Sequence, residues 1–149
     1  MNPSCRESAF TTNELLVVLI IVGLLAVFTT PSLSRWLSHF NLNSAARDIA
    51  SELQLARLKA IAQNTPFRIS FDTQNKSYQV EREVSPGTWE RVGTANTLPL
   101  RVHFRQVTAA PVFHPNGTAT GRTAITLQDA QGTHTISIIV SPTGYIRIE

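Results

Sequence analysis

The chain has 149 residues, enough for one domain and too few for two ordinary ones. Apolar residues make up 42% of it and charged residues 15%, a composition that excludes a disordered chain. The 13 Lys and Arg exceed the 10 Asp and Glu by only three, which excludes the dense basic surface of a histone-like protein. The single cysteine, Cys5, excludes an internal disulfide and a multi-cysteine metal site.

A long apolar run occupies the N-terminal part of the chain. Every residue from Leu15 to Phe28 is apolar or glycine, and no charge occurs between Glu14 and Arg35. A helix of this uncharged length spans roughly 30 Å, the thickness of a bilayer core, so the run predicts a transmembrane helix. Three alternatives stay open: a core helix, a signal peptide and an ordinary membrane anchor. So small a domain could hardly cover a helix that is apolar all round, and a signal peptide would need a good cleavage site, which is missing before Pro31.

A carboxylate stands at the start of this run. Glu14 directly precedes Leu15. An unpaired acid within hydrocarbon costs roughly 2.5 to 3.5 kcal/mol. We therefore expect Glu14 to have a cationic partner.

The segment from Ala9 to Val18 resembles the class III signal of type IV pilins and type II secretion pseudopilins. In that family a prepilin peptidase cuts before a Phe and the new amine is methylated. An acid lies four residues after the Phe and a proline often lies 21 residues after it, as Glu14 and Pro31 do after Phe10. The resemblance implies cleavage between Ala9 and Phe10. It also implies that Glu14 faces the amine of Phe10 on a neighbouring subunit of a filament.

Two features depart from the family pattern. Ala9 stands where Gly is usual before the cut, and the leader has one basic residue and one acid where a net positive charge is usual. If the leader is removed, Cys5 leaves with it. The partners that the resemblance implies are other pilins or pseudopilins, the prepilin peptidase and the inner membrane.

After the apolar run the pattern becomes that of an amphipathic helix, which we expect to continue to about Asn64. The expected apolar stripe comprises Leu33, Trp36 or Leu37, Phe40, Ala45, Ile49, Leu53, Ala56 and Ala60. Pro31 removes one backbone donor, so a kink is expected there. Pro66 disfavours helix in the residue before it and ends the helix.

The remaining residues, 65–149, predict β structure. Phe67, Ile69 and Phe71 alternate with polar residues, and this period of two indicates a half-buried strand. Turn-forming residues separate further expected strands at 78–84, 89–92, 98–105, 124–128, 133–140 and 145–148. About seven short strands predict an α+β fold, with an antiparallel sandwich or a pair of sheets on the C-terminal half of the long helix.

Three segments of this half resemble the GspH/FimT group of minor pilins and pseudopilins. They are Leu-Gln-Leu-Ala-Arg at 53–57 with Ala60 and Asn64, Phe-His-Pro-Asn-Gly at 113–117, and Val-Ser-Pro-Thr-Gly-Tyr-Ile-Arg at 140–147. The resemblance implies a type IV pilin-like fold, and it agrees with the periodicity.

The expected organisation is a leader at 1–9, a transmembrane and assembly helix at 10–34, an amphipathic helix at 35–64 and a β-rich domain at 65–149. The resemblance implies that the inner membrane holds the chain by one span, with the globular domain in the periplasm, until it joins a filament.

Two functions follow from the resemblance. The first is that of a non-catalytic structural subunit, a minor pilin of a type IV pilus or a minor pseudopilin of a type II secretion pseudopilus. Pro31 favours the pilus, because FimT-like chains include this proline while the secretion proteins often lack it.

The alternative is a FimT-like minor pilin that binds DNA during DNA uptake. Arg122 and Arg147 would contact phosphates, and Arg101 and Arg105 are expected on one strand face. The Gly-Arg-x-Arg pattern of the family is half present, because Tyr145 occupies the first Arg position. Solvated strand arginines are the simpler interpretation.

The sequence predicts no enzyme, cofactor or metal site. Its four histidines are scattered and accompany no HExxH-like spacing; they are His39, His103, His114 and His134. Neither a GxSxG nor a GxxxxGK[ST] motif occurs. We expect a substrate of processing enzymes rather than an enzyme.

Overall fold

The structure is a computed structural model that describes the backbone of residues 11–149, and the side chains of these residues except 26–38. The expected leader and the cleavage pair Ala9 and Phe10 lie outside the described residues. Contacts divide the chain into two compact units, Met1–Trp36 and Leu37–Glu149. Each unit is considered by itself below.

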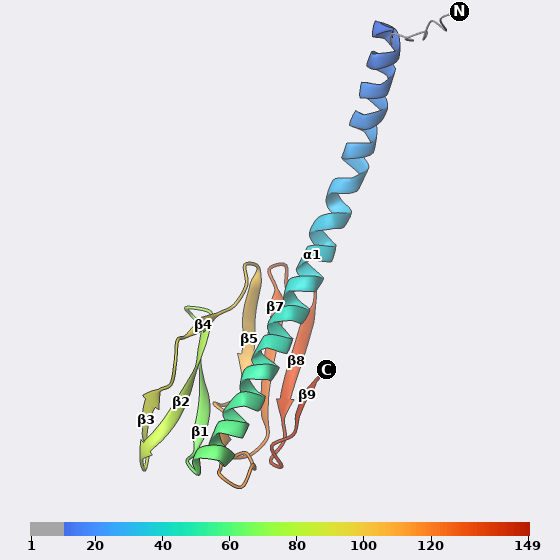
Figure 1. Cartoon of the computed structure of the whole chain (residues 1–149). Helices are drawn as coiled ribbons and strands as arrows, with labels where there is room; N and C mark the ends of the chain where they lie inside the picture. The colour runs from blue at the N-terminus through green and yellow to red at the C-terminus, as the bar shows by residue number, and fades with distance from the viewer. Residues whose placement is uncertain (1–10) are drawn as a thin grey trace, which may run out of the picture. The chain divides into compact units, whose positions relative to one another are not determined.

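Helix α1 (Thr12–Gln63) passes from the first unit into the second (Figure 1). Asn64 follows it with a left-handed φ of 50°, and the backbone N–H of Thr65 donates to the carbonyl of Ala60 at 3.3 Å. This bond and the left-handed residue form a C-terminal cap of the Schellman type, with Asn in place of the usual Gly. The predicted end of the helix near Asn64 is confirmed.

Pro31 lies within α1, in the part whose side chains are not described. The kink expected at this residue therefore stays a prediction. In the part of the chain that the structure describes, no helix is both long enough and apolar enough to span a membrane.

The first expected members of the buried stripe, Leu33 and Trp36 or Leu37, lie where side chains are not described, and the stripe differs from the expected one at its first described member. Phe40 is 58% exposed, whereas Leu42 is 1% exposed, so the prediction for Phe40 is wrong. Phe40 and Ala45 are five residues apart, which at about 100° per residue places them on different faces of the helix. The rest of the stripe from Ala45 is confirmed, and its buried members are Ala45, Ala46, Ile49, Ala50, Leu53, Ala56 and Ala60.

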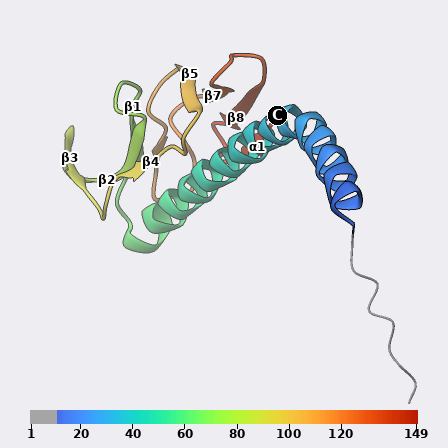
Figure 2. The same ribbon diagram turned by 90° about the horizontal axis from the view of Figure 1, so that it is seen from above.

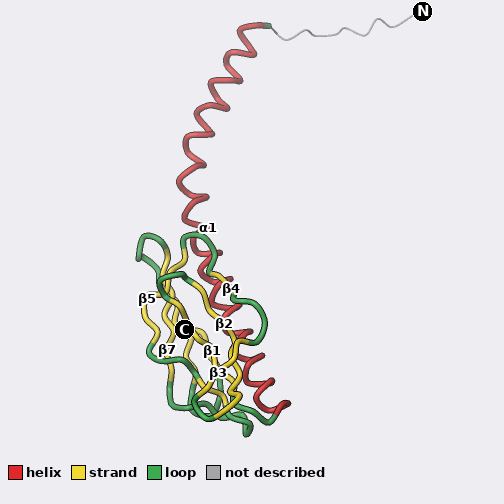
Figure 3. Tube along the Cα trace, turned by 90° about the vertical axis from the view of Figure 1, so that its left-hand side faces the viewer, coloured by secondary structure: helices red, strands yellow, loops and turns green. Residues whose placement is uncertain are grey.

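Two antiparallel sheets lie on the second-unit part of α1, and this confirms the expected pair of sheets (Figures 1 and 3). The first sheet has the order β3-β2-β1-β6 with β4 beside β2, and comprises β1 (Phe67–Asp72), β2 (Ser77–Ser85), β3 (Thr88–Arg91), β4 (Asn96–Thr97) and β6 (Val112–Phe113). The second sheet has the order β5-β7-β8-β9, and comprises β5 (Val102–Val107), β7 (Thr123–Asp129), β8 (Thr135–Val140) and β9 (Ile146–Ile148). The sequence did not predict β4 and β6, each two residues long, because a period cannot be read from two residues.

The core forms where the stripe of α1 meets the inner faces of both sheets. In the second unit the strands of both sheets lie on one side of α1 (Figure 2). Phe67 and Phe113 of the first sheet and Ile125 and Ile138 of the second are fully buried in the same cluster as Ile49. Alternate residues of β7 are buried, from Thr123 to Asp129, as the period of two predicts.

Candidate functional site

Glu14 lies in the first turn of α1, and its backbone is held by a helix cap. The N–H of Glu14 donates to Oγ1 of Thr11 at 3.3 Å. Thr11 and Glu14 have the spacing of a capping box, in which a Thr precedes a Glu by three residues. An acid in the first turn also interacts favourably with the helix dipole. The carboxylate of Glu14 forms no hydrogen bond or ion pair with any residue that the structure describes.

The four arginines proposed for DNA lie on different elements of the second unit. Arg101 precedes β5 in a turn and has a φ of 71°, while Arg105 is the residue without a register partner at the β5 bulge. The expectation that Arg101 and Arg105 share a strand face is therefore wrong, because the regular strand begins after Arg101. Arg122 is exposed just before β7, and Arg147 of β9 forms an ion pair with Glu149.

Arg57 joins the last turns of α1 to the turn between β6 and β7. Its Nε donates to the backbone carbonyl of Gly117 at 2.8 Å, although the two residues are 60 positions apart. Gly117 is buried and has a φ of 80°, a conformation that favours glycine. The bond is charge-assisted, and it gives the carbonyl of the buried Gly117 a hydrogen-bond partner.

Gly144 of the β8–β9 turn lies against the same two groups. A Cβ built on Gly144 would come within 2.1 Å of the Gly117 carbonyl oxygen and 2.7 Å of Arg57 Nε. The two turns are also joined by the backbone, because the N–H of Ala119 donates to the carbonyl of Pro142 at 2.9 Å. We call Arg57, Gly117 and Gly144 the Arg57 clasp.

The clasp brings together the three segments that carry the GspH/FimT resemblance. Arg57 closes the first segment, Gly117 closes the second, and Gly144 lies within the third. Their contact ties the end of α1 to one end of both sheets. These motifs therefore have a structural role, which the sequence did not predict because nothing in it states which distant turns meet.

A second polar network fixes the turn between β7 and β8. Asp129 is 3% exposed, and its two oxygens accept from the Thr133 hydroxyl at 2.7 Å and the Thr133 N–H at 2.8 Å. Oδ2 also lies 3.1 Å from Nδ1 of His134. Burial raises the pKa of the Asp129 carboxyl, but the hydrogen bonds from Thr133 and His134 outweigh it and hold this pKa well below its usual range.

Two of the four scattered histidines meet in this region. The rings of His39, on α1, and His134 have centroids 3.9 Å apart. Among the described residues, no group of three or more His, Cys, Asp or Glu side chains could hold a metal ion. The contact between the His39 and His134 rings joins the β7–β8 turn of the second sheet to α1.

The chain has the type IV pilin-like class of fold. A long N-terminal helix begins with an N-terminal cap next to an acidic residue, and its second half packs on two antiparallel sheets. The turns that contain Gly117 and Gly144 fasten the helix there. The chain belongs to the GspH family: the family model described as type II transport protein GspH matches residues 45–144, which include the whole clasp. Type II secretion system protein H of Xanthomonas campestris pv. campestris is 29% identical over 119 residues, which cover 79% of this chain and 70% of that protein.

Two solved structures have the same fold. The minor pseudopilin EpsH from the type 2 secretion system of Vibrio cholerae matches with a TM-score of 0.62 and 13% identity, over 73% of this chain and 96% of that one. The type IV minor pilin FimU of Pseudomonas aeruginosa matches with a TM-score of 0.62 and 18% identity, over 74% of this chain and 90% of that one. The pilin-like α+β fold predicted from the sequence is thus confirmed.

Proposed function

We propose that this chain is a non-catalytic minor subunit of a pilin-like filament, assembled through its N-terminal helix. The two solved neighbours, one from a secretion system and one a minor pilin, match equally well, so the fold alone does not separate the two machines. The GspH family and the curated relative favour the type II secretion pseudopilus. We take a minor pseudopilin as the leading form of the proposal and a minor pilin as the second.

The observation that carries the proposal is the state of Glu14. Its backbone is capped by Thr11, so the residue has a defined position, yet its carboxylate has no partner among the described residues. The apolar side chains that follow it are exposed, Leu15 at 56% and Leu19 at 62%. A helix of this kind needs apolar neighbours and a cation near Glu14, and a bundle of similar subunits would supply both.

The proposal includes the expected processing and location. Prepilin peptidase would cut between Ala9 and Phe10, and the inner membrane would hold the subunit through residues 10–34, with the globular unit in the periplasm. Mass spectrometry of protein from cells with that peptidase should give a chain that starts at Phe10 and is about 14 Da heavier than the unmodified chain. A mature chain that starts near Thr29 or Pro31 would contradict this part.

Assembly is tested at Glu14. Glu14→Ala and Glu14→Gln should leave membrane localisation and folding unchanged but abolish incorporation into filaments, because the lone subunit can keep the carboxylate at the membrane surface. Glu14→Asp should retain part of the incorporation. The measurement compares sheared filaments with inner membranes. If Glu14→Ala protein appears in filaments at the wild-type level, the assembly role is wrong.

The DNA-uptake alternative has less support. Arg147 is engaged by Glu149, and Arg101 and Arg105 do not share a strand. A salt-dependent gel shift that is lost in Arg122→Ala and Arg147→Ala would favour it.

A further inference from the structure

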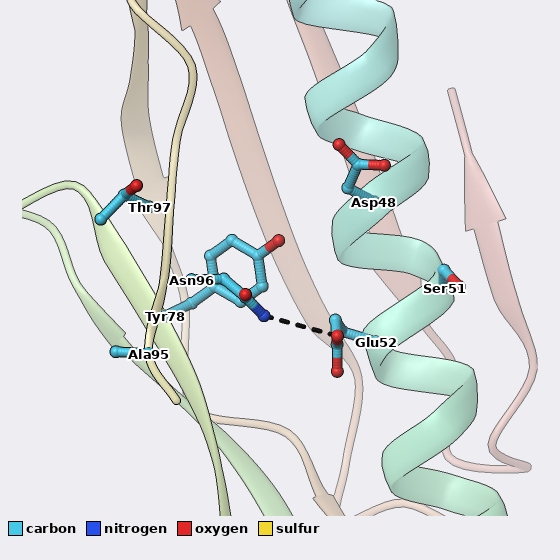
Figure 4. A pocket seen from close by; sticks show the side chains of 7 residues that line it. All are labelled: Asp48, Ser51, Glu52, Tyr78, Ala95, Asn96 and Thr97. Carbon is cyan, nitrogen blue, oxygen red and sulfur yellow. Dashed lines mark hydrogen bonds between the residues drawn. The ribbon is translucent and has the colours of Figure 1, made fainter. Parts of the chain in front are cut away.

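A polar pocket of about 480 Å³ opens between α1 and the first sheet (Figure 4). Asp48 and Glu52 line the pocket from α1. Tyr78 of β2 lines it from the sheet side, together with Ala95, Asn96 and Thr97 at β4. Asp48 and Glu52 are four positions apart, so they are neighbours on the helix surface and repel each other. No ion pair with a described residue neutralises either carboxylate.

Tyr78 gives a second and independent sign that the pocket takes a ligand. The residue is 5% exposed, yet its hydroxyl points across the pocket towards α1 and forms no hydrogen bond with any described residue (Figure 4). Since no buried side-chain oxygen among the described residues lacks a partner, this hydroxyl is the solvent-accessible end of an otherwise buried side chain, and a ligand in the pocket can reach it. Burial and then the charges of Asp48 and Glu52 raise the pKa of Tyr78 to about 12, so the hydroxyl keeps its proton and can both accept and donate.

The groups in the pocket select the chemistry of the ligand. Two carboxylates and a phenol oxygen accept hydrogen bonds, and Asn96 already donates its amide to Glu52 at 3.4 Å. None of the residues that line the pocket carries a positive charge. The described residues include no cluster of three or more His, Cys, Asp or Glu that would hold a metal ion. A guanidinium group fits, because it is always charged and presents five donors in a plane.

We propose that this pocket binds the guanidinium group of an arginine side chain carried by a neighbouring subunit, an inference that rests on the proposed role of the chain in a filament. The guanidinium lies between Asp48 and Glu52 and donates to both carboxylates and to the Tyr78 hydroxyl. The volume of the pocket also takes the methylene stem of the arginine.

The first test is a titration of the full-length chain in detergent micelles at constant ionic strength, followed by NMR of the Asn96 side-chain amide and the Tyr78 ring. The probes are methylguanidinium, a blocked tripeptide with a central arginine, tetramethylammonium and calcium chloride. The first two should give saturable shifts at millimolar concentration. Tetramethylammonium should give none, because it has the charge but no donors. Calcium should give none, because the site has too few ligands.

Variants locate the binding. Asp48→Asn combined with Glu52→Gln should abolish the shifts, and Tyr78→Phe should weaken binding roughly fivefold, as the loss of one hydrogen bond implies. Glu90→Gln is the matched control, because it neutralises an exposed carboxylate outside the pocket and should bind as the wild type does. Absent shifts with both guanidinium probes, unchanged binding in the double variant or tighter binding of calcium would overturn the proposal.

The source of the guanidinium is tested separately. The double variant should be depleted from sheared filaments, and Glu90→Gln should not be. If methylguanidinium binds while the peptide does not, or if the double variant enters filaments normally, the pocket takes a free cation and the partner assignment is wrong. The titration needs no filament, so its result is independent of the Glu14 experiment that tests the proposed function.

Discussion

Gly144→Ala should destabilise the globular unit far more than the same change at another left-handed glycine. The new Cβ would lie 2.1 Å from the Gly117 carbonyl oxygen, so one of the two turns must move. That movement breaks the 2.8 Å bond from Arg57 to Gly117, which as a hydrogen bond to a charged group is worth about 1.5 to 3 kcal/mol. A left-handed alanine costs about 1 to 2 kcal/mol more. We expect a loss of roughly 2.5 to 5 kcal/mol, a large part of the ~5 to 15 kcal/mol that stabilises a typical protein.

Gly87→Ala is the matched control for this prediction. Gly87 has the same φ of 78° as Gly144, but nothing lies within 4 Å of a Cβ built on it. Urea unfolding of a chain that begins near residue 33 measures both variants, and Gly87→Ala should lose only about 1 to 2 kcal/mol. Equal losses in the two variants would show that the close approach in the clasp has no energetic weight.

Three further predictions concern the same truncated chain, which should stay in solution without detergent and give a mixed α/β circular dichroism spectrum. Ile49→Asp or Leu53→Asp should unfold it, because each residue is fully buried and an unpaired carboxylate there costs several kcal/mol; wild-type stability would show that the core is placed wrongly. Tyr78 has a raised pKa in the folded state, so between about pH 10 and 12 its hydroxyl loses its proton in the unfolded state before it does in the folded state. The free energy of unfolding should therefore fall by roughly 2 to 3 kcal/mol over this range. Tyr78→Phe should lack this decrease, and the control Tyr145→Phe should retain it. Asp129 has a lowered pKa in the folded state, so its contribution is present at neutral pH and is lost as the pH falls below about 4; Asp129→Asn should lose about 1 to 3 kcal/mol at pH 7, and its difference from the wild type should shrink in acid.

The elements could be predicted from the sequence because each is set by a local period. The spacing of Ala45, Ile49 and Leu53 predicts a buried stripe on α1, and the alternation at Phe67 and Ile69 predicts a strand with one buried face; both are buried as expected. The prediction is wrong at Phe40, where a five-residue step leaves the stripe. The helix cap by Thr11 was also available in the sequence, as a Thr followed three residues later by a Glu.

The polar contacts could not be predicted in this way, because periodicity assigns a residue to a face and says nothing about what that face meets. Arg57 has the spacing of a solvated residue between members of the stripe, yet it reaches a turn 60 residues away. Glu52 has the same kind of position and faces a hydroxyl from β2 and an amide from β4. For both Arg57 and Glu52, the arrangement of the strands places the polar partner beside the helix, so these contacts depend on the topology of the fold. A search for functional residues in such a chain should therefore begin with polar side chains at the edge of a buried stripe, where helix and sheet diverge and charges can lie beside buried groups.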